Sequence, residues 1–137
     1  MQVPPIVMPM QADSNFNINK YKGKFVFVEF WASWCAPCRN SNQNIVELFH
    51  QYQQEKKDVV FVMISLDDKR QNWQKALLQD SLQPMINLID TLAWKSKVAN
   101  DFGINSIPAS FLINKEGYIV GKDLTKREVQ LLIKKME

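Results

Sequence analysis

Histidine and cysteine are scarce in this sequence of 137 residues, which contains one histidine and two cysteines. A structural zinc site needs four ligands in a tetrahedral arrangement. Cys35, Cys38 and His50 cannot complete such a set, and we therefore expect no metal and no other bound cofactor. His50 falls in the middle of a predicted helix, where it is expected to be a surface or packing residue.

Long hydrophobic runs and clusters of one charge are also missing. No apolar segment reaches the about 18 residues that a membrane helix needs. The chain has 17 Lys and Arg against 14 Asp and Glu, a net charge of +3, and its basic residues are scattered. Nucleic acid and an anionic membrane surface are therefore not expected as partners.

The first ten residues include three prolines and lack both a basic segment and a small-residue cleavage site. They do not have the pattern of a signal peptide. We expect the chain to be either cytosolic or a mature or trimmed form of an exported protein. Its length suits one compact domain over residues 1–137, with residues 1–20 irregular apart from two short edge strands near 6–10 and 16–18.

Apolar runs and helical spacing predict the remaining elements. The expected strands are 25–31, 59–66, 109–113 and 118–122; the expected helices are 35–56, 69–80, 95–102 and one from 126 onward. Residues 83–93 are expected to be less regular, and 114–117 to form a hairpin turn. Strand–helix–strand order implies parallel pairing with right-handed crossovers. The fold class is therefore α/β, with a central mixed sheet flanked by helices on both faces.

The two cysteines stand three residues apart at the expected start of a helix, where residues i and i+3 share one face. A bridge between them closes a very small loop, so its effect on the unfolded chain is slight. A helix N-terminus stabilises a thiolate and so activates a thiol. We expect the more exposed Cys35 to attack a partner disulfide and Cys38 to resolve the mixed disulfide. A metal site and inert core thiols are the alternatives.

Glu29 interrupts the apolar strand 25–31. A buried carboxylate is costly unless it is paired or protonated, and its pKa rises. Glu29 lies six residues before Cys35 and could exchange a proton with Cys38, directly or through water. The alternatives are an outward-facing side chain or an ion pair with a lysine such as Lys24. By itself, the Ile107–Pro108 sequence predicts only an extended or turn segment.

Residues 27–39, which include Trp34-Cys35-Ala36-Pro37-Cys38, resemble the active-site signature of the thioredoxin superfamily. Residues 102–113 resemble its second signature. The intervening segment 65–102 looks like the TlpA/ResA-like branch, which carries an extra helix and strand. The resemblance covers nearly the whole chain from about residue 21. It implies a thioredoxin fold and a thiol–disulfide oxidoreductase whose redox-active group is the Cys35–Cys38 disulfide.

The resemblance also assigns residues to a substrate site. It implies that the Ile107–Pro108 peptide bond is cis and faces the cysteines, where Pro108 keeps metal off the thiols. The backbone of Ile107 would bind the substrate chain. Trp34, with Ala36 and Pro37 beside it, would flank the binding groove.

For Glu29, the resemblance implies the family's buried acid position. The sequence also departs from the family at two places, of which the second bears on Glu29. The segment 39–44 lacks the acidic residue and the proline that are usual in this branch, so the helix is expected to be straighter. Met63 falls near the place of the lysine that accompanies the buried acid in ordinary thioredoxins. The negative charge of Glu29 is thus less neutralised than that of the buried acid in ordinary thioredoxins.

Members of this branch are commonly exported, periplasmic or membrane-tethered, and many reduce disulfides of specific partner proteins. The resemblance therefore implies protein dithiol or disulfide substrates, an upstream electron donor, a monomer and an extracytoplasmic location. Two other functions are alternatives. A non-enzymatic binding module would use the groove around Trp34 and Pro108. A peroxiredoxin-like peroxidase would carry threonine and proline where this chain has Ala32 and Val28.

Overall fold

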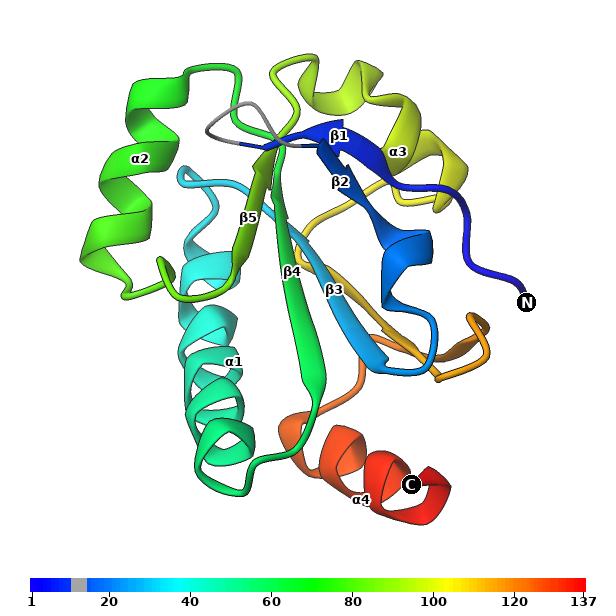
Figure 1. Ribbon diagram of the computed structural model, residues 1–137. Helices are drawn as coiled ribbons and strands as arrows, with labels where there is room; N and C mark the ends of the chain where they lie inside the picture. Colours follow the sequence, from blue (N-terminus) through cyan, green and yellow to red (C-terminus); the bar gives the residue numbers. More distant parts are fainter. Residues whose placement is uncertain (11–14) are drawn as a thin grey trace.

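The computed structural model describes residues 1–10 and 15–137. Its central sheet has the strand order β5–β4–β3–β6–β7 (Figure 1). The strands are β3 (Phe25–Trp31), β4 (Val59–Ser65), β5 (Ile86–Ile89), β6 (Ala109–Ile113) and β7 (Ile119–Lys122). The β3–β4 and β4–β5 pairs are parallel, whereas β3–β6 and β6–β7 are antiparallel. The mixed α/β fold predicted from the sequence is confirmed.

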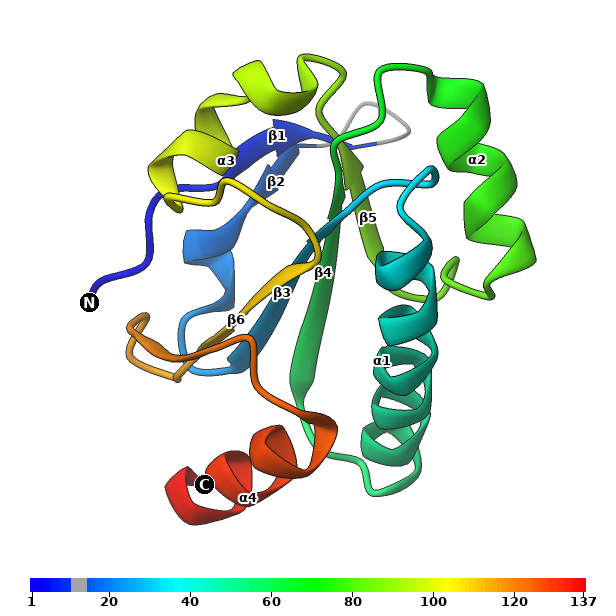
Figure 2. The same ribbon diagram turned by 180° about the vertical axis from the view of Figure 1, so that it is seen from behind.

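In the parts of the chain that the structure describes, four α-helices are present, and they lie around the sheet (Figures 1 and 2). They are α1 (Ala36–Gln54), α2 (Arg70–Gln79), α3 (Lys97–Asp101) and α4 (Lys126–Met136), and two short 3₁₀ helices cover Ile18–Tyr21 and Ala93–Lys95. Successive side chains of a strand point to opposite faces. From β3, one set packs in a core with α1, α2 and α4: Phe25, Phe27 and Trp31. The other set packs with α3 and the N-terminal strands: Val26, Val28 and Phe30.

The N-terminal strands β1 (Val7–Pro9) and β2 (Asn15–Asn17) differ from the expected edge strands. They pair with each other in an antiparallel two-stranded sheet and do not extend the central one. Their buried side chains, among them Met8 and Phe16, close one face of the central sheet. The region thus holds two short strands, and burial of their apolar side chains places them against a face of the central sheet.

Residues 83–93 are the second difference. They were expected to be irregular, but they contain β5, which pairs in parallel with β4 at the sheet edge. Ile86–Ile89 is only four residues long and mostly half-buried, so no clear alternation marks it. The helix expected over 95–102 is shorter, because Ser96 accepts a hydrogen bond from the Ala99 N–H and starts α3 after a separate 3₁₀ turn.

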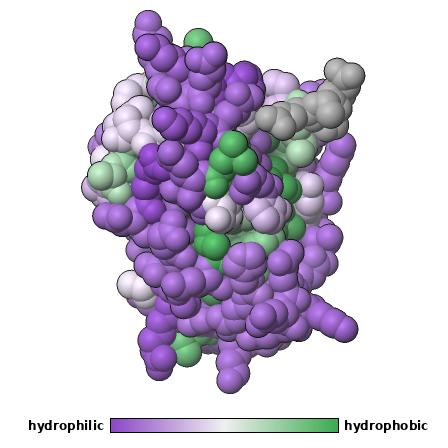
Figure 3. All heavy atoms as spheres, turned by 90° about the vertical axis from the view of Figure 1, so that its left-hand side faces the viewer, coloured by the Kyte–Doolittle hydropathy of each residue, from purple (hydrophilic) through white to green (hydrophobic). Residues whose placement is uncertain are grey.

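The side of the molecule that carries α2 is mostly hydrophilic, with a few hydrophobic side chains near its centre (Figure 3). A cleft of about 390 Å³ lies there between α2 and β5, and Trp73 and Met85 are among its lining residues. None of the residues predicted for the site lines it. No helix in the described parts of the chain is long and apolar enough to span a membrane.

Candidate functional site

The site lies at one edge of the central sheet, where strand direction brings two distant loops together. β3 ends at Trp31 and leads into the cysteine segment. β6 runs antiparallel to β3, and Ala109 at its start pairs with Phe30 near the end of β3. The end of β3 and the beginning of β6 therefore meet at the same edge, which places Pro108 beside the loop that precedes α1.

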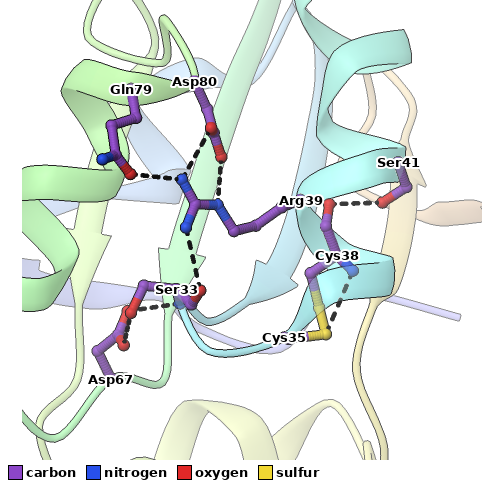
Figure 4. Close-up of polar contacts among 8 residues, drawn as sticks. All are labelled: Ser33, Cys35, Cys38, Arg39, Ser41, Asp67, Gln79 and Asp80. Atoms are coloured by element: carbon purple, nitrogen blue, oxygen red, sulfur yellow. Dashed lines mark hydrogen bonds and ion pairs between the residues drawn. A yellow bond between two sulfur atoms is a disulfide. The ribbon is translucent and has the colours of Figure 1, made fainter.

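Cys35 and Cys38 form a disulfide at the start of α1 (Figure 4). Cys35 is the N-cap residue and Pro37 lies in the first turn, where proline costs no hydrogen bond. The backbone N–H of Cys38 donates to Cys35 Sγ at 3.2 Å. Cys35 is 6% exposed and Cys38 is fully buried. In the reduced pair, this N–H and the helix N-terminus would stabilise a thiolate on Cys35, which is the sulfur that a partner can reach.

The backbone before Pro108 lies against the disulfide. The carbonyl oxygen of Ile107 is 3.9 Å from Cys35 Sγ. A disulfide sulfur carries no hydrogen, so this is a contact and not a hydrogen bond. The Ile107–Pro108 peptide bond is cis. The structure thus brings together three of the residues named from the sequence: the two cysteines and Ile107.

Trp34, Ala36 and Pro37 surround Cys35 on the outside. The Trp34 side chain is 60% exposed, and Ala36 and Pro37 are also exposed. An exposed tryptophan beside a reactive group is an apolar surface available to a partner chain. The three residues therefore leave an exposed surface beside Cys35.

Glu29 is 3% exposed. It belongs to the set of β3 side chains that face α1, and its strand neighbours are Met63 and Ser110. The side chain does not face outward, and Lys24, the lysine considered as its partner, pairs with Asp58 at 3.4 Å. Burial first, and then the negative charge of Asp123, raise the pKa of Glu29 well above its ordinary value of 4.5.

Asn42 connects Glu29 with the resolving cysteine. The orientation of a side-chain amide is assigned from its hydrogen bonds. With its nitrogen toward two acceptors, Asn42 donates to the Cys38 carbonyl at 3.1 Å and to Glu29 Oε2 at 3.3 Å. Asn42 was not named from the sequence. Its signal was its spacing, because Cys38, Asn42 and Ile45 fall at i, i+4 and i+7 and all three are buried.

A cleft of about 290 Å³ between α1, β6 and the start of α4 reaches Glu29 and Pro108. Its polar lining comes from Ser41, Ser110 and Asp123, among others. A space of this size with several polar groups can hold water. The cleft therefore places a space with polar lining beside the buried Glu29 carboxyl.

The raised pKa of Glu29 makes stability depend on pH. The folded protein holds this proton more tightly than the unfolded chain, so the contribution of Glu29 to stability is fully present below about pH 4.5 and is lost as pH rises toward the folded pKa. We expect Glu29→Gln to be more stable than wild type at pH 7. The difference should grow by about 1.4 kcal/mol per pH unit within that window.

Urea unfolding of both proteins between pH 4 and pH 8 measures this difference. Glu116→Gln is the matched control, because Glu116 is exposed in the β6–β7 turn. A stability difference between Glu29→Gln and wild type that does not change with pH would contradict the predicted titration.

His50 is exposed on α1, in agreement with its expected surface role. Across residues 1–10 and 15–137, no group of three or more His, Cys, Asp or Glu side chains is arranged to hold a metal ion. The disulfide of this site consists of the protein's own two sulfur atoms.

Comparison with known proteins adds a family. Residues 23–119 match the family model described as thioredoxin-like. The thiol-disulfide oxidoreductase ResA of Geobacillus thermodenitrificans is 28% identical over 130 residues, covering 93% of this chain and 71% of the relative. ResA of Bacillus thuringiensis is 27% identical over 138 residues, covering 98% and 76%. A thiol-disulfide oxidoreductase from Bacteroides fragilis superposes with a TM-score of 0.88 at 23% identity, covering 100% of both chains.

The match to the family model spans the strand before the cysteines, the disulfide and Pro108. The structural likeness confirms the fold. The sequence relatives agree with the chemistry of two cysteines at a helix start. The chain therefore belongs to the thioredoxin-like family and is a thiol–disulfide oxidoreductase whose redox-active group is the Cys35–Cys38 pair.

Proposed function

We propose that this protein reduces disulfides in partner proteins. The observation that carries the proposal is the position of Cys35: it caps α1, accepts the Cys38 N–H at 3.2 Å and lies 3.9 Å from the Ile107 carbonyl. A thiolate there is stabilised by the helix start and remains accessible to a partner chain.

The reaction proceeds in two exchanges. The Cys35 thiolate attacks one sulfur of the partner disulfide, and a mixed disulfide forms as the partner's other sulfur leaves as a thiolate. The Cys38 thiolate then attacks Cys35 Sγ, which forms the Cys35–Cys38 disulfide and releases the partner's second thiolate. Two electrons pass to the partner. An upstream dithiol donor must reduce the Cys35–Cys38 pair before the next cycle.

Glu29 is the proposed acceptor of the Cys38 proton. The Asn42 amide touches both the Cys38 carbonyl and the Glu29 carboxyl, and the adjoining cleft gives a path to solvent. Since Cys38 is fully buried, its thiol needs a nearby base to ionise. A buried carboxyl of raised pKa can accept that proton and return it in the reverse direction.

The proposed substrate contacts surround Cys35. An extended partner segment would lie against the backbone of Ile107, next to Pro108. Trp34, Ala36 and Pro37 would supply apolar contact from the other side. The exposure of these last three residues supports this arrangement.

We further propose that the protein acts as a monomer outside the cytoplasm, in the periplasm or tethered to a membrane in its full-length form. The resemblance to the TlpA/ResA-like branch supports this location. Partner proteins there contain the disulfides that such a reductant requires.

A redox titration tests the proposed direction of electron flow. We expect the Cys35–Cys38 pair to have a reduction potential of about −270 mV or lower, near that of thioredoxin, when equilibrated against dithiothreitol and glutathione. Alkylation of the free thiols followed by mass spectrometry counts the reduced fraction. The Cys38→Ser variant, which cannot close the disulfide, is the control. A value near that of a strong oxidant, about −120 mV, would contradict the proposal.

A further inference from the structure

Arg39 directly follows the resolving cysteine and makes the largest set of side-chain hydrogen bonds near the site (Figure 4). Its Nε and Nη2 donate to the two carboxylate oxygens of Asp80 at 2.8 and 2.9 Å. Nη2 also donates to Gln79 Oε1 at 2.9 Å. Nη1 reaches the backbone carbonyl of Ser33 at 3.4 Å. Arg39 therefore joins the end of α2 to the loop that precedes Cys35.

Asp67 holds the same loop from the other side. It follows β4 and is 1% exposed. One oxygen accepts the Ser33 hydroxyl at 2.6 Å, and the other accepts the Ser33 N–H at 3.0 Å and the Ser65 hydroxyl at 2.6 Å. A carboxylate with three donors has a well-defined position. Ser33 is thus bonded through its N–H and hydroxyl to Asp67 and through its carbonyl to Arg39.

Two further backbone hydrogen bonds hold the ends of this loop. The Leu66 N–H donates to the Trp31 carbonyl at 2.8 Å, and the Cys35 N–H donates to the Ala32 carbonyl at 3.1 Å. The path from the end of β3 to Cys35 therefore has its position set by residues of the β4–α2 segment. Movement of Ser33 would shift Cys35 relative to the first turn of α1, and hence relative to the Cys38 N–H.

We propose that Arg39, held by Asp80, is a positioning residue that sets the reduction potential of the Cys35–Cys38 pair through Ser33. The inference deepens the proposed function and rests on it. The Cys38 N–H stabilises a thiolate on Cys35, and this thiolate exists only in the reduced protein. A looser Ser33 loop weakens that hydrogen bond and destabilises the reduced form. The potential then falls, because stabilisation of the reduced form is what raises it.

Two variants separate position from charge. Arg39→Lys keeps the positive charge but loses the bidentate hydrogen bond to Asp80 and the hydrogen bond to the Ser33 carbonyl. Asp80→Asn removes a negative charge near the site, which by its field alone would favour the thiolate and raise the potential. The same substitution also weakens the hydrogen bonds that hold the Arg39 guanidinium. Positioning therefore predicts a fall in both variants, whereas a field effect predicts no change in the first and a rise in the second.

The measurement is the equilibrium of each variant with glutathione. We expect the reduction potential of Arg39→Lys to fall by about 30 mV, which is a tenfold change in its equilibrium constant with glutathione. The reduction potential of Asp80→Asn should fall by a smaller amount. The rate at which iodoacetamide alkylates Cys35 at pH 7 should fall in parallel. Arg127→Lys is the control, since Arg127 is exposed on α4 and makes no hydrogen bond or ion pair with any residue that the structure describes.

Each outcome decides the inference. The inference would be overturned if the equilibrium constant of Arg39→Lys with glutathione stayed within about twofold of the wild-type value. It would also be overturned if Asp80→Asn had a higher reduction potential than wild type. A lower melting temperature with an unchanged potential would show a structural role only and would also overturn it. If Arg39→Lys does not fold, Asp80→Asn decides alone. A wild-type potential typical of an oxidant would reject the proposed direction of electron flow, but the comparison between variant and wild type would still be measured.

Discussion

Replacing Cys35 by serine is expected to reduce the rate of disulfide reduction to the background seen without protein. A serine hydroxyl cannot form a disulfide, and Cys38 cannot take over the attack because it is fully buried, whereas Cys35 is the more exposed of the two at 6%. Reduction of an insulin-like disulfide substrate by the prereduced protein measures the rate.

The complementary variant isolates the second exchange. In Cys38→Ser, Cys35 still attacks, but no sulfur is left to displace the partner, so the mixed disulfide accumulates and is visible by mass spectrometry. Gln53→Ser, an exposed change farther along α1, controls for substitution in the same helix. Wild-type activity in Cys35→Ser would reject the mechanism, and partner capture without both cysteines would favour a non-enzymatic binding module.

Replacing Glu29 by glutamine is expected to slow the resolving step by about a hundredfold, the lower end of what a positioned acid or base contributes. Glutamine preserves the shape of the side chain and can still accept the Asn42 hydrogen bond, but it cannot take the Cys38 proton. The first attack, which Cys35 makes at the surface, should keep its wild-type rate. The two rates thus distinguish loss of a base from loss of structure.

The pH dependence of resolution gives a second readout. Burial raises the pKa of Glu29 well above 4.5, so the carboxyl is protonated at low pH and gains the capacity to accept a proton as pH rises through that pKa. The wild-type rate should rise through this inflection, which should be absent in Glu29→Gln. Stopped-flow release of a labelled peptide from the mixed disulfide measures it, with Glu116→Gln as control. An unchanged rate and inflection in Glu29→Gln would contradict the role of Glu29 as base.

Elements with a strong local pattern could be predicted from the sequence. Residues 25–31 form a continuous run of β-forming, mostly apolar side chains, and β3 has those limits. The apolar stripe of α4 and the proline in the first turn of α1 were equally clear. β5 was not predicted as a strand, because four mostly half-buried residues at an edge depend on pairing with β4 more than on their own pattern.

The candidate site divides in the same way. The spacing of Cys35 and Cys38 and the place of Glu29 in a strand were visible without a structure. Asn42, Asp67 and Arg39 were not singled out, because a polar residue in a helix or loop is usually solvated. Their roles depend on partners far away in the chain: Asp67 is 34 positions from Ser33, and Arg39 is 41 from Asp80.

The sequence by itself determined which chemistry is available to this protein, since two sulfurs three residues apart at a helix start can meet and form a disulfide. It also determined the strands and helices that have their own periodicity. Only the tertiary structure decided the environment of those sulfurs. The antiparallel pairing of β6 with β3 brings the Ile107 carbonyl to Cys35, and packing of α1 on β3 places Asn42 between Cys38 and Glu29. These contacts depend on distance in space, which no local pattern of residues records.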